Sequence, residues 1–202
     1  MTTADPILAA ALSPLRELHL ADLLARMARA IDAGADIVPE PWKRGPDGRV
    51  LRDGVLDLPS RHDFEAEESG RITHPDVRTP LPRQLAATLT PLELIAAPGL
   101  SLRVTPFRWE AAMLAMEIEG GVPDLTPLRR WFLEFSQPGT EQMETEDLLG
   151  VVHSMSDPEP LPAGIAFHID FGSAPIVAVA ELAEAAAQAG ARHARLGSFD
   201  GI

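Results

Sequence analysis

Two histidines and two carboxylates in the C-terminal half of the sequence have side chains suited to acid–base or metal chemistry. His168 and Asp170 alternate with apolar residues, Glu117 lies in a segment with a similar alternation, and His153 lies in another segment that is predicted to be a strand. A histidine beside a carboxylate can act as a general base, because the carboxylate holds the imidazole in one tautomer. Two histidines with two carboxylates can also bind a divalent metal.

The strand pattern around His168 determines where these groups point. Every second residue belongs to an apolar set: Ile165, Phe167, Ile169 and Phe171. A strand that buries this set turns His168 and Asp170 to the opposite, open face of its sheet. If the preceding strand forms a hairpin centred near Pro160, His153 lies opposite His168, and Glu117 points the same way from its own strand. These four residues are the candidate site, although polar residues on the open side of a strand are also typical of an ordinary surface.

The same half of the chain alternates between strand and helix patterns. Strands are predicted at 113–118, 148–155, 165–171 and 192–199, with helices from Thr126 to the Pro138-Gly139 break and over 175–189. Connections between parallel strands are right-handed, so both helices should cover one face of the sheet. The sequence therefore predicts an α+β fold, with a ferredoxin-like βαββαβ sandwich over about 109–202.

The N-terminal part of the chain has two different patterns. Apolar residues recur at three- and four-residue spacing from Ser13 to Ala33, which predicts an amphipathic helix with Ser13 as N-cap and Pro14 in its first turn. From Pro39 to Pro82 turn residues prevail, and two Asp-Gly pairs are suited to closing short hairpins. We expect this Pro/Gly-rich segment to be an irregular arm that binds a partner or wraps over the fold.

These patterns divide the chain into three parts: the helix (1–36), the arm (37–84) and the sandwich (85–202). At the start of the sandwich, Thr90 to Glu93 has capping-box spacing and predicts a short helix. The alternation over 100–104 predicts a strand, and either this strand or the last one could lie at the sheet edge.

Composition excludes several classes of function. The 202 residues include 17 basic and 30 acidic side chains and no cysteine, so the formal charge at neutral pH is −13. No disulfide, thiol nucleophile or thiolate metal site can form, and so acidic a chain should not bind nucleic acid. We expect no membrane span, because no run of about 18 apolar residues occurs. The N-terminus lacks the basic region of a signal peptide, which favours a cytoplasmic location.

The acidic excess is concentrated in the sandwich. Residues 1–109 carry 13 basic and 15 acidic side chains, whereas 110–202 carry 4 and 15. Four of these acids lie close together in one expected loop: Glu141, Glu144, Glu146 and Asp147. Such a loop can steer a basic protein partner, and Trp42 in the arm could anchor it. The simpler interpretation is an acidic surface that keeps the protein soluble.

Nucleotide-binding, zincin, nucleophile-elbow and calcium-loop motifs are absent from the sequence. The patterns favour a non-catalytic, acidic interaction module of the inhibitor, antidote or assembly-factor type, with no cofactor. Its partner would be a basic protein or a second copy of the chain. The alternative is a small enzyme or ligand-binding domain that uses the His/carboxylate cluster on the open sheet face.

Overall fold

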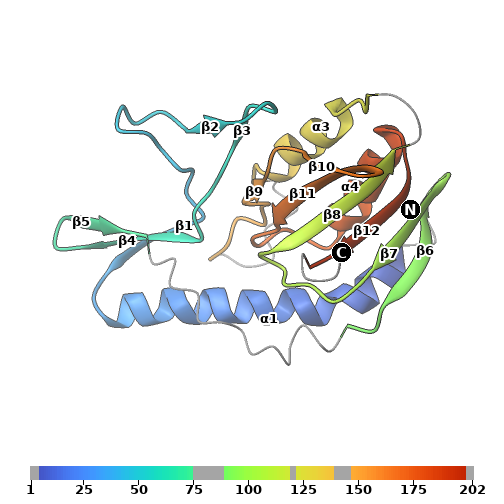
Figure 1. Ribbon diagram of the computed structural model, residues 1–202. Helices are drawn as coiled ribbons and strands as arrows, with labels where there is room; N and C mark the ends of the chain where they lie inside the picture. Colours follow the sequence, from blue (N-terminus) through green and yellow to red (C-terminus); the bar gives the residue numbers. More distant parts are fainter. Residues whose placement is uncertain (1–4, 75–88, 119–121, 139–146, 199–202) are drawn as a thin grey trace.

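The computed structural model describes residues 5–74, 89–118, 122–138 and 147–198 of the 202-residue chain. The described residues form a mixed α+β fold in which a long N-terminal helix runs beside a sheet backed by two shorter helices (Figure 1). The helices are α1 (Asp5–Asp32), α3 (Thr126–Phe135) and α4 (Val177–Gln188). No helix in this part of the chain has the length and apolar character needed to cross a bilayer.

The main sheet has the strand order β10-β11-β8-β12-β7-β6, and β9 also pairs with β11. Neighbouring strands are antiparallel except for β12 and β7, which are parallel. The strands are β6 (Leu92–Ala97), β7 (Leu100–Val104), β8 (Ala112–Ile118), β9 (Ser154–Met155), β10 (Glu159–Leu161), β11 (Gly164–Asp170) and β12 (Ala191–Gly197). The α+β class is confirmed, whereas the ferredoxin-like order stays a prediction.

The arm forms two small sheets that lie to one side of the main sheet (Figure 1). One contains β1 (Asp36–Pro39), β4 (Phe64–Glu68) and β5 (Arg71–Thr73), and the other contains β2 (Arg52–Asp53) and β3 (Leu58–Pro59). Phe64 packs with Leu23 and Met27 of α1 in a small core of its own. The two Asp-Gly pairs both lie in turns that join paired segments.

The main core lies between the sheet and the helices. The expected inner face of α3 is confirmed, because Leu128, Trp131, Phe132 and Phe135 are buried. Trp131 also donates a 2.8 Å hydrogen bond from Nε1 to the carbonyl of Ala178, which fixes α3 against α4. The strands expected at 100–104, 113–118, 165–171 and 192–199 are present as β7, β8, β11 and β12.

The N-terminal helix is longer than its sequence pattern predicts. It begins at Asp5, and the expected N-cap, Ser13, lies inside it and donates a 2.7 Å hydrogen bond from Oγ to the carbonyl four residues earlier. Pro14 removes a backbone donor at this point. Packing compensates, because Leu8 and Leu12 are fully buried in the main core. The prediction of a helix start at Ser13 is therefore wrong.

The segment after Thr90 is a strand and not the predicted short helix. β6 pairs antiparallel with β7, and over its first four residues half-buried leucines alternate with the exposed Glu93 and Ile95. A helix of one or two turns is unstable alone, whereas an edge strand gains backbone hydrogen bonds along the side that faces its neighbour. Tertiary pairing has overridden the local capping signal here.

Most of the predicted strand at 148–155 is irregular, and only Ser154–Met155 pairs with the sheet. The backbone N–H of Leu149 donates to a carboxylate oxygen of Glu40 at 2.6 Å. The next two N–H groups donate to Ser173 Oγ at 2.9 and 3.1 Å. Because side chains from other elements satisfy these donors, the segment needs no strand neighbour.

Candidate functional site

The uncovered face of the main sheet carries two rows of polar side chains. In the first row Glu93, Arg103, Arg195 and Ala115 are register partners on β6, β7, β12 and β8. In the second row Ser101, His193 and Glu117 are partners on β7, β12 and β8. Corresponding residues of the two rows are two positions apart on each strand, so both rows share one face, about 7 Å apart.

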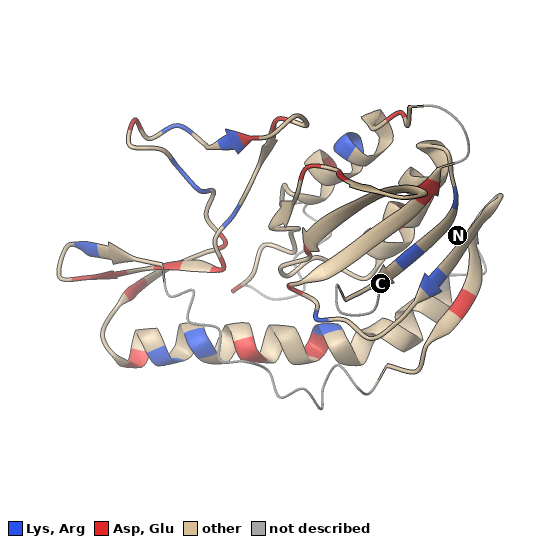
Figure 2. Ribbon diagram, in the orientation of Figure 1, with Lys and Arg blue, Asp and Glu red and all other residues tan. Residues whose placement is uncertain are grey.

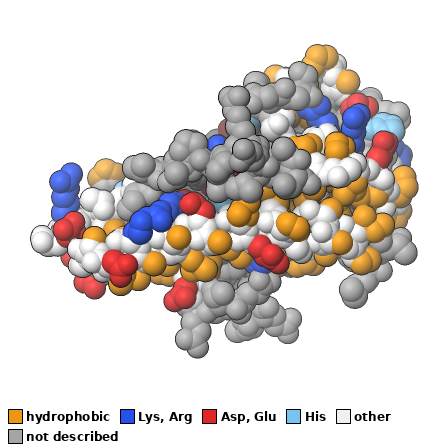
Figure 3. All heavy atoms as spheres, turned by 90° about the horizontal axis from the view of Figure 1, so that it is seen from below, with side chains coloured by type: hydrophobic (Ala, Val, Ile, Leu, Met, Phe, Trp, Pro, Cys, Tyr) orange, Lys and Arg blue, Asp and Glu red, His pale blue; other side chains and the backbone are white. Residues whose placement is uncertain are grey.

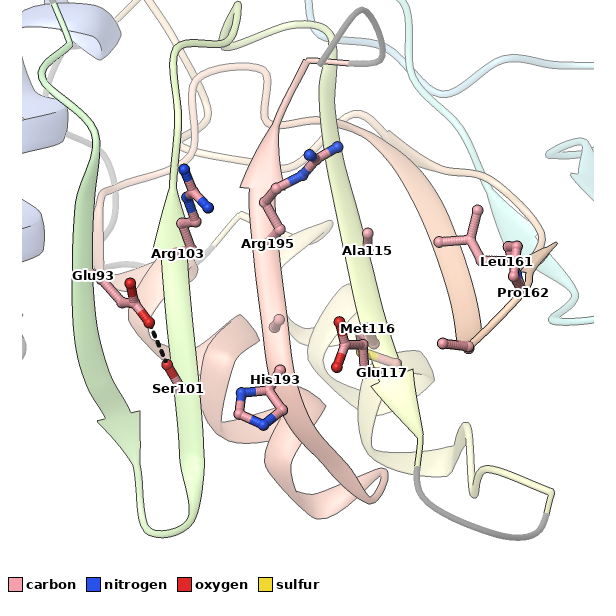
Figure 4. A pocket seen from close by; sticks show the side chains of 13 residues that line it. Glu93, Ser101, Arg103, Ala115, Met116, Glu117, Leu161, Pro162, His193 and Arg195 are labelled. Carbon is pink, nitrogen blue, oxygen red and sulfur yellow. Dashed lines mark hydrogen bonds between the residues drawn. The ribbon is translucent and has the colours of Figure 1, made fainter. Parts of the chain in front are cut away.

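These rows line a hollow of about 550 Å³, which we call the sheet-face pocket. Arg103 and Arg195 point to the same side of it from neighbouring strands, and His193 and Glu117 lie at its other end (Figure 4). Ser101 donates a 3.3 Å hydrogen bond from Oγ to Glu93 Oε1. Figure 2 shows blue segments on both of the strands that Figure 1 labels β7 and β12. One end of the pocket therefore holds an arginine pair with Glu93 beside Arg103, and the other end holds a carboxylate and an imidazole.

A second group, which we call the His153 cluster, lies between the arm and the sandwich. It consists of Glu40, Asp63, His153 and Asp170, whose side chains are 0, 3, 1 and 13% exposed. His153 Nε2 lies 2.7 Å from Glu40 Oε1. His153 Nδ1 lies 3.3 Å from Asp63 Oδ1 and 4.0 Å from Asp170 Oδ2. Each ring nitrogen of one buried imidazole thus faces carboxylate oxygen.

Local backbone structure positions Glu40 and His153. Glu40 follows β1 in the left-handed region, with φ of +46°, and its Oε1 also accepts the Ser173 N–H at 3.2 Å. Gly172 has φ of +51°, and a Cβ there would lie 2.2 Å from His153 Cδ2. Only glycine allows the chain after β11 to pass this close to the imidazole.

Each aspartate of the cluster is held through one of its two carboxylate oxygens. Asp63 Oδ2 accepts a 2.7 Å hydrogen bond from Arg26 Nη2 of α1, and Asp170 Oδ1 accepts the Gly172 N–H at 3.0 Å. The other oxygen of each carboxylate faces His153 Nδ1. The orientation of both carboxylates is therefore set by contacts outside the cluster.

The charges in the cluster are strongly coupled. Burial lowers the pKa of His153, but hydrogen bonds with Asp63 and Glu40 and the charges of Asp170 and Glu40 raise it to about 10. Burial raises the pKa of Glu40, and the hydrogen bond and charge of His153 outweigh this effect and lower it. With a proton on both nitrogens, His153 is a cation at neutral pH that the surrounding carboxylates stabilise.

A hollow of about 520 Å³, which we call the arm pocket, adjoins the cluster. Asp63 and Asp170 form part of its wall, together with Lys43, His168 and Ser156. Cluster carboxylates are thus reachable from solvent even though His153 itself is enclosed.

Arg61 anchors the arm at this pocket. Its guanidinium donates to the Ser136 carbonyl at 3.0 Å and to the Glu40 carbonyl, and it lies 3.5 Å from the Trp42 ring centroid. Its backbone N–H donates to the His153 carbonyl at 2.9 Å. Trp42, expected to anchor a partner, packs here on Arg61 and is half-buried.

The structure brings together only part of the four-residue site expected from the sequence. His168 and Asp170 face the arm pocket, whereas His153 is buried beneath the arm. His168 lies 3.5 Å from Glu159 and is 43% exposed. Glu117 pairs with Gly164, so it lies about 13 Å along the sheet from His168.

The reason is the register of the hairpin. Ser154 pairs with Asp170, which centres the turn on Pro162 and not on Pro160. His168 consequently bonds with Ser156, whose N–H donates to its carbonyl at 2.8 Å. The observed partner of His168, Ser156, lies three residues after the expected partner, His153. A register shift by an odd number of residues turns every side chain of the shifted strand to the other face of the sheet. The expectation that His153 lies opposite His168 on the open face is therefore wrong.

The expected acidic loop lies mostly outside the described residues. Glu141, Glu144 and Glu146 are not described, and Asp147 is exposed. Its role in binding a partner stays a prediction.

Sequence reasoning missed Glu40, Asp63, His193 and the arginine pair. Arg103 and Arg195 alternate with apolar residues on their strands, a signal that was available, but their pairing requires the order of β7 and β12. Glu40 and Asp63 lie in the arm and approach His153 only through tertiary folding.

Comparisons with protein-family models, with curated proteins and with solved structures give no match to this chain.

Proposed function

We propose that the protein is a binding domain for a small anionic ligand, which it holds in the sheet-face pocket. The observation that carries this proposal is the register pairing of Arg103 with Arg195 on the open face. Strands lie about 4.8 Å apart, so the two guanidinium groups can grip one carboxylate or phosphate group together. The proposal corresponds to the second hypothesis of the sequence analysis, a ligand-binding domain that uses the open sheet face. The histidine in the pocket is His193, and not His153 or His168.

The other row of the pocket favours a ligand with a hydrogen-bond donor. Glu117 and His193 lie about 7 Å from the arginine row, within the length of a small organic acid. Salt screens charges that lie more than about 8 Å away, so most of the net charge of −13 acts weakly on the pocket, whose acidic lining residues are Glu93 and Glu117. The proposal assigns no reaction to the pocket.

Calorimetric titration with inorganic phosphate, acetate and glycerol phosphate tests the proposal. We expect saturable binding of at least one of these anions, weakened at least tenfold by Arg103→Gln and by Arg195→Gln. Arg71→Gln on β5 removes an exposed arginine far along the chain from the pocket and should leave binding unchanged. The proposal is wrong if no anion binds, or if all three variants weaken binding equally.

We also propose, as a second candidate, the interaction module that binds a basic protein. The concentration of 15 acidic against 4 basic residues in 110–202 favours it. Apolar side chains also gather along the surface seen from below (Figure 3). Among the exposed apolar side chains of the described residues are Ile7 and Ile31 of α1.

Binding to lysozyme as a basic probe, compared with binding to the partner found by low-salt affinity purification, tests this second candidate. A specific partner should bind at least tenfold more tightly than lysozyme and lose affinity steeply with salt. Changing Glu141, Glu144, Glu146 and Asp147 together to glutamine should weaken it. Affinity that is independent of both salt and these acids would exclude the module.

The ferredoxin-like grouping of the sandwich, the cytoplasmic location and a homodimer remain proposals. The antiparallel pairing of β11 with β8 and of β8 with β12 supports the first.

A further inference from the structure

We propose that Asp63, His153 and Asp170 bind a divalent transition-metal ion, with Glu40 as a positioning residue behind the imidazole. The proposal is independent of ligand binding in the sheet-face pocket, which uses other residues. It rests on the arrangement of donor atoms around His153 Nδ1.

The three donor atoms already lie close to the spacing that one ion requires. Nδ1 of His153 is 3.3 Å from Asp63 Oδ1 and 4.0 Å from Asp170 Oδ2, and all three lie within 4.8 Å of one another. Metal–ligand bonds of about 2.1 Å place adjacent ligands roughly 3.0 to 3.4 Å apart and opposite ligands about 4.2 Å apart. Movements of less than about 1 Å would complete the site.

The surrounding contacts orient each ligand as metal sites do. A metal-binding histidine usually donates its second ring N–H to a carboxylate, which fixes the tautomer. Glu40 accepts from His153 Nε2 at 2.7 Å in this way. Arg26 and the Gly172 N–H hold the outer oxygens of Asp63 and Asp170, so the inner oxygens face Nδ1. An ion would take the place of the proton on Nδ1.

The donor set and its access define the class of metal. One imidazole nitrogen with two carboxylate oxygens suits Zn²⁺, Mn²⁺, Fe²⁺ or Co²⁺ better than Mg²⁺, which requires oxygen ligands. Asp63 and Asp170 border the arm pocket, which gives the ion an entry path and leaves coordination positions for water or a ligand.

A second histidine group on the arm must be separated from this one. His62, Glu65 and His74 also lie within reach of one ion, and the two imidazole rings stack 3.9 Å apart. His74 is 38% exposed. This group therefore serves as an internal comparison in the experiment.

The test loads the full chain, stripped with chelator, with Zn²⁺, Co²⁺ or Mg²⁺ and measures bound metal by equilibrium dialysis with elemental analysis. We expect one Zn²⁺ or Co²⁺ per chain, no comparable Mg²⁺, and visible Co²⁺ absorption. Asp170→Asn, at the most exposed ligand, and Glu40→Gln should each weaken Co²⁺ binding at least tenfold and alter its spectrum. Circular dichroism of the metal-free variants checks that they fold.

Matched controls are His168→Gln in the arm pocket and His74→Gln in the second group, both expected to retain the ion. Failure of the wild-type chain to retain any ion at micromolar concentration would overturn the proposal, and so would binding that His74→Gln abolishes and Asp170→Asn does not. If Asp170→Asn does not fold, Glu40→Gln takes its place in this comparison, and Co²⁺ binding that His74→Gln abolishes and Glu40→Gln does not would overturn the proposal. None of these outcomes depends on whether phosphate or acetate binds at Arg103 and Arg195.

Discussion

At the scale of single residues, the His153 cluster places an imidazole where the interior could have held an apolar side chain. Transferring charge from water costs several kcal/mol per ion, and only close counter-charges with good hydrogen bonds offset this cost. His153 meets the requirement with carboxylates at both nitrogens. The cluster therefore tolerates little change in the backbone that surrounds it, and Gly172 is the tightest point.

We predict that Gly172→Ala destabilises the protein by roughly 3 kcal/mol, from left-handed strain and from collision with the imidazole. Gly190→Ala is the matched control, because its φ is also positive, at +99°, but its Cβ would meet nothing within 4 Å. That control should cost only about 1 kcal/mol. Urea unfolding measures both, and equal losses would show that contact with His153 is unimportant.

At the scale of elements, the structure of segments with a periodic sequence could be predicted, whereas the structure of irregular segments could not. The alternation of β11 and the apolar face of α3 are both visible in their own stretches of sequence, so the strand and the helix could be predicted. The segment before β9 depends on acceptors from Glu40 and Ser173, which lie far away in the sequence. For the same reason the histidine of the candidate site was identified but its partners Glu40 and Asp63 were not.

We predict that Ser173→Ala costs about 1–3 kcal/mol of stability, because it leaves two buried backbone N–H groups without their acceptor. Ser101→Ala, whose hydroxyl bonds to Glu93 on the exposed sheet face, should change stability by less than about 0.5 kcal/mol. Thermal unfolding of the two variants provides the comparison. A similar small change in both would mean that Ser173 does not hold the segment.

At the scale of the whole molecule, the arm is attached to the sandwich at several points. Asp157 accepts the Val55 N–H at 2.8 Å, Arg129 donates to the Leu56 carbonyl at 2.9 Å, and Arg61 donates to the Ser136 carbonyl. The arm that the sequence suggested was irregular is thus part of the packed structure over its described residues.

We predict that the metal-free protein is most stable between about pH 4.5 and 6.5. Burial raises the pKa of Glu110, but His19 and Arg108 lower it to about 2 from a reference of 4.5, so its contribution is lost as pH falls from about 4.5 toward 2. The raised pKa of His153 acts oppositely, because its contribution is complete below 6.5 and is lost as pH rises toward about 10.

Chemical denaturation across pH measures both limits. Glu110→Gln should flatten the acid side, and Asp170→Asn should reduce the slope on the alkaline side. If both variants keep the wild-type dependence of unfolding free energy on pH, Glu110 and His153 do not determine the two limits of stability.

The division of the His153 cluster between two parts of the chain also constrains inheritance. Glu40 and Asp63 come from the arm, whereas His153 and Asp170 come from the sandwich. A chimeric protein that combined the arm of one homologue with the sandwich of another could leave ionised side chains of the cluster buried without their partners. We therefore expect the two parts to descend together, with compensating substitutions at these four positions when either part diverges.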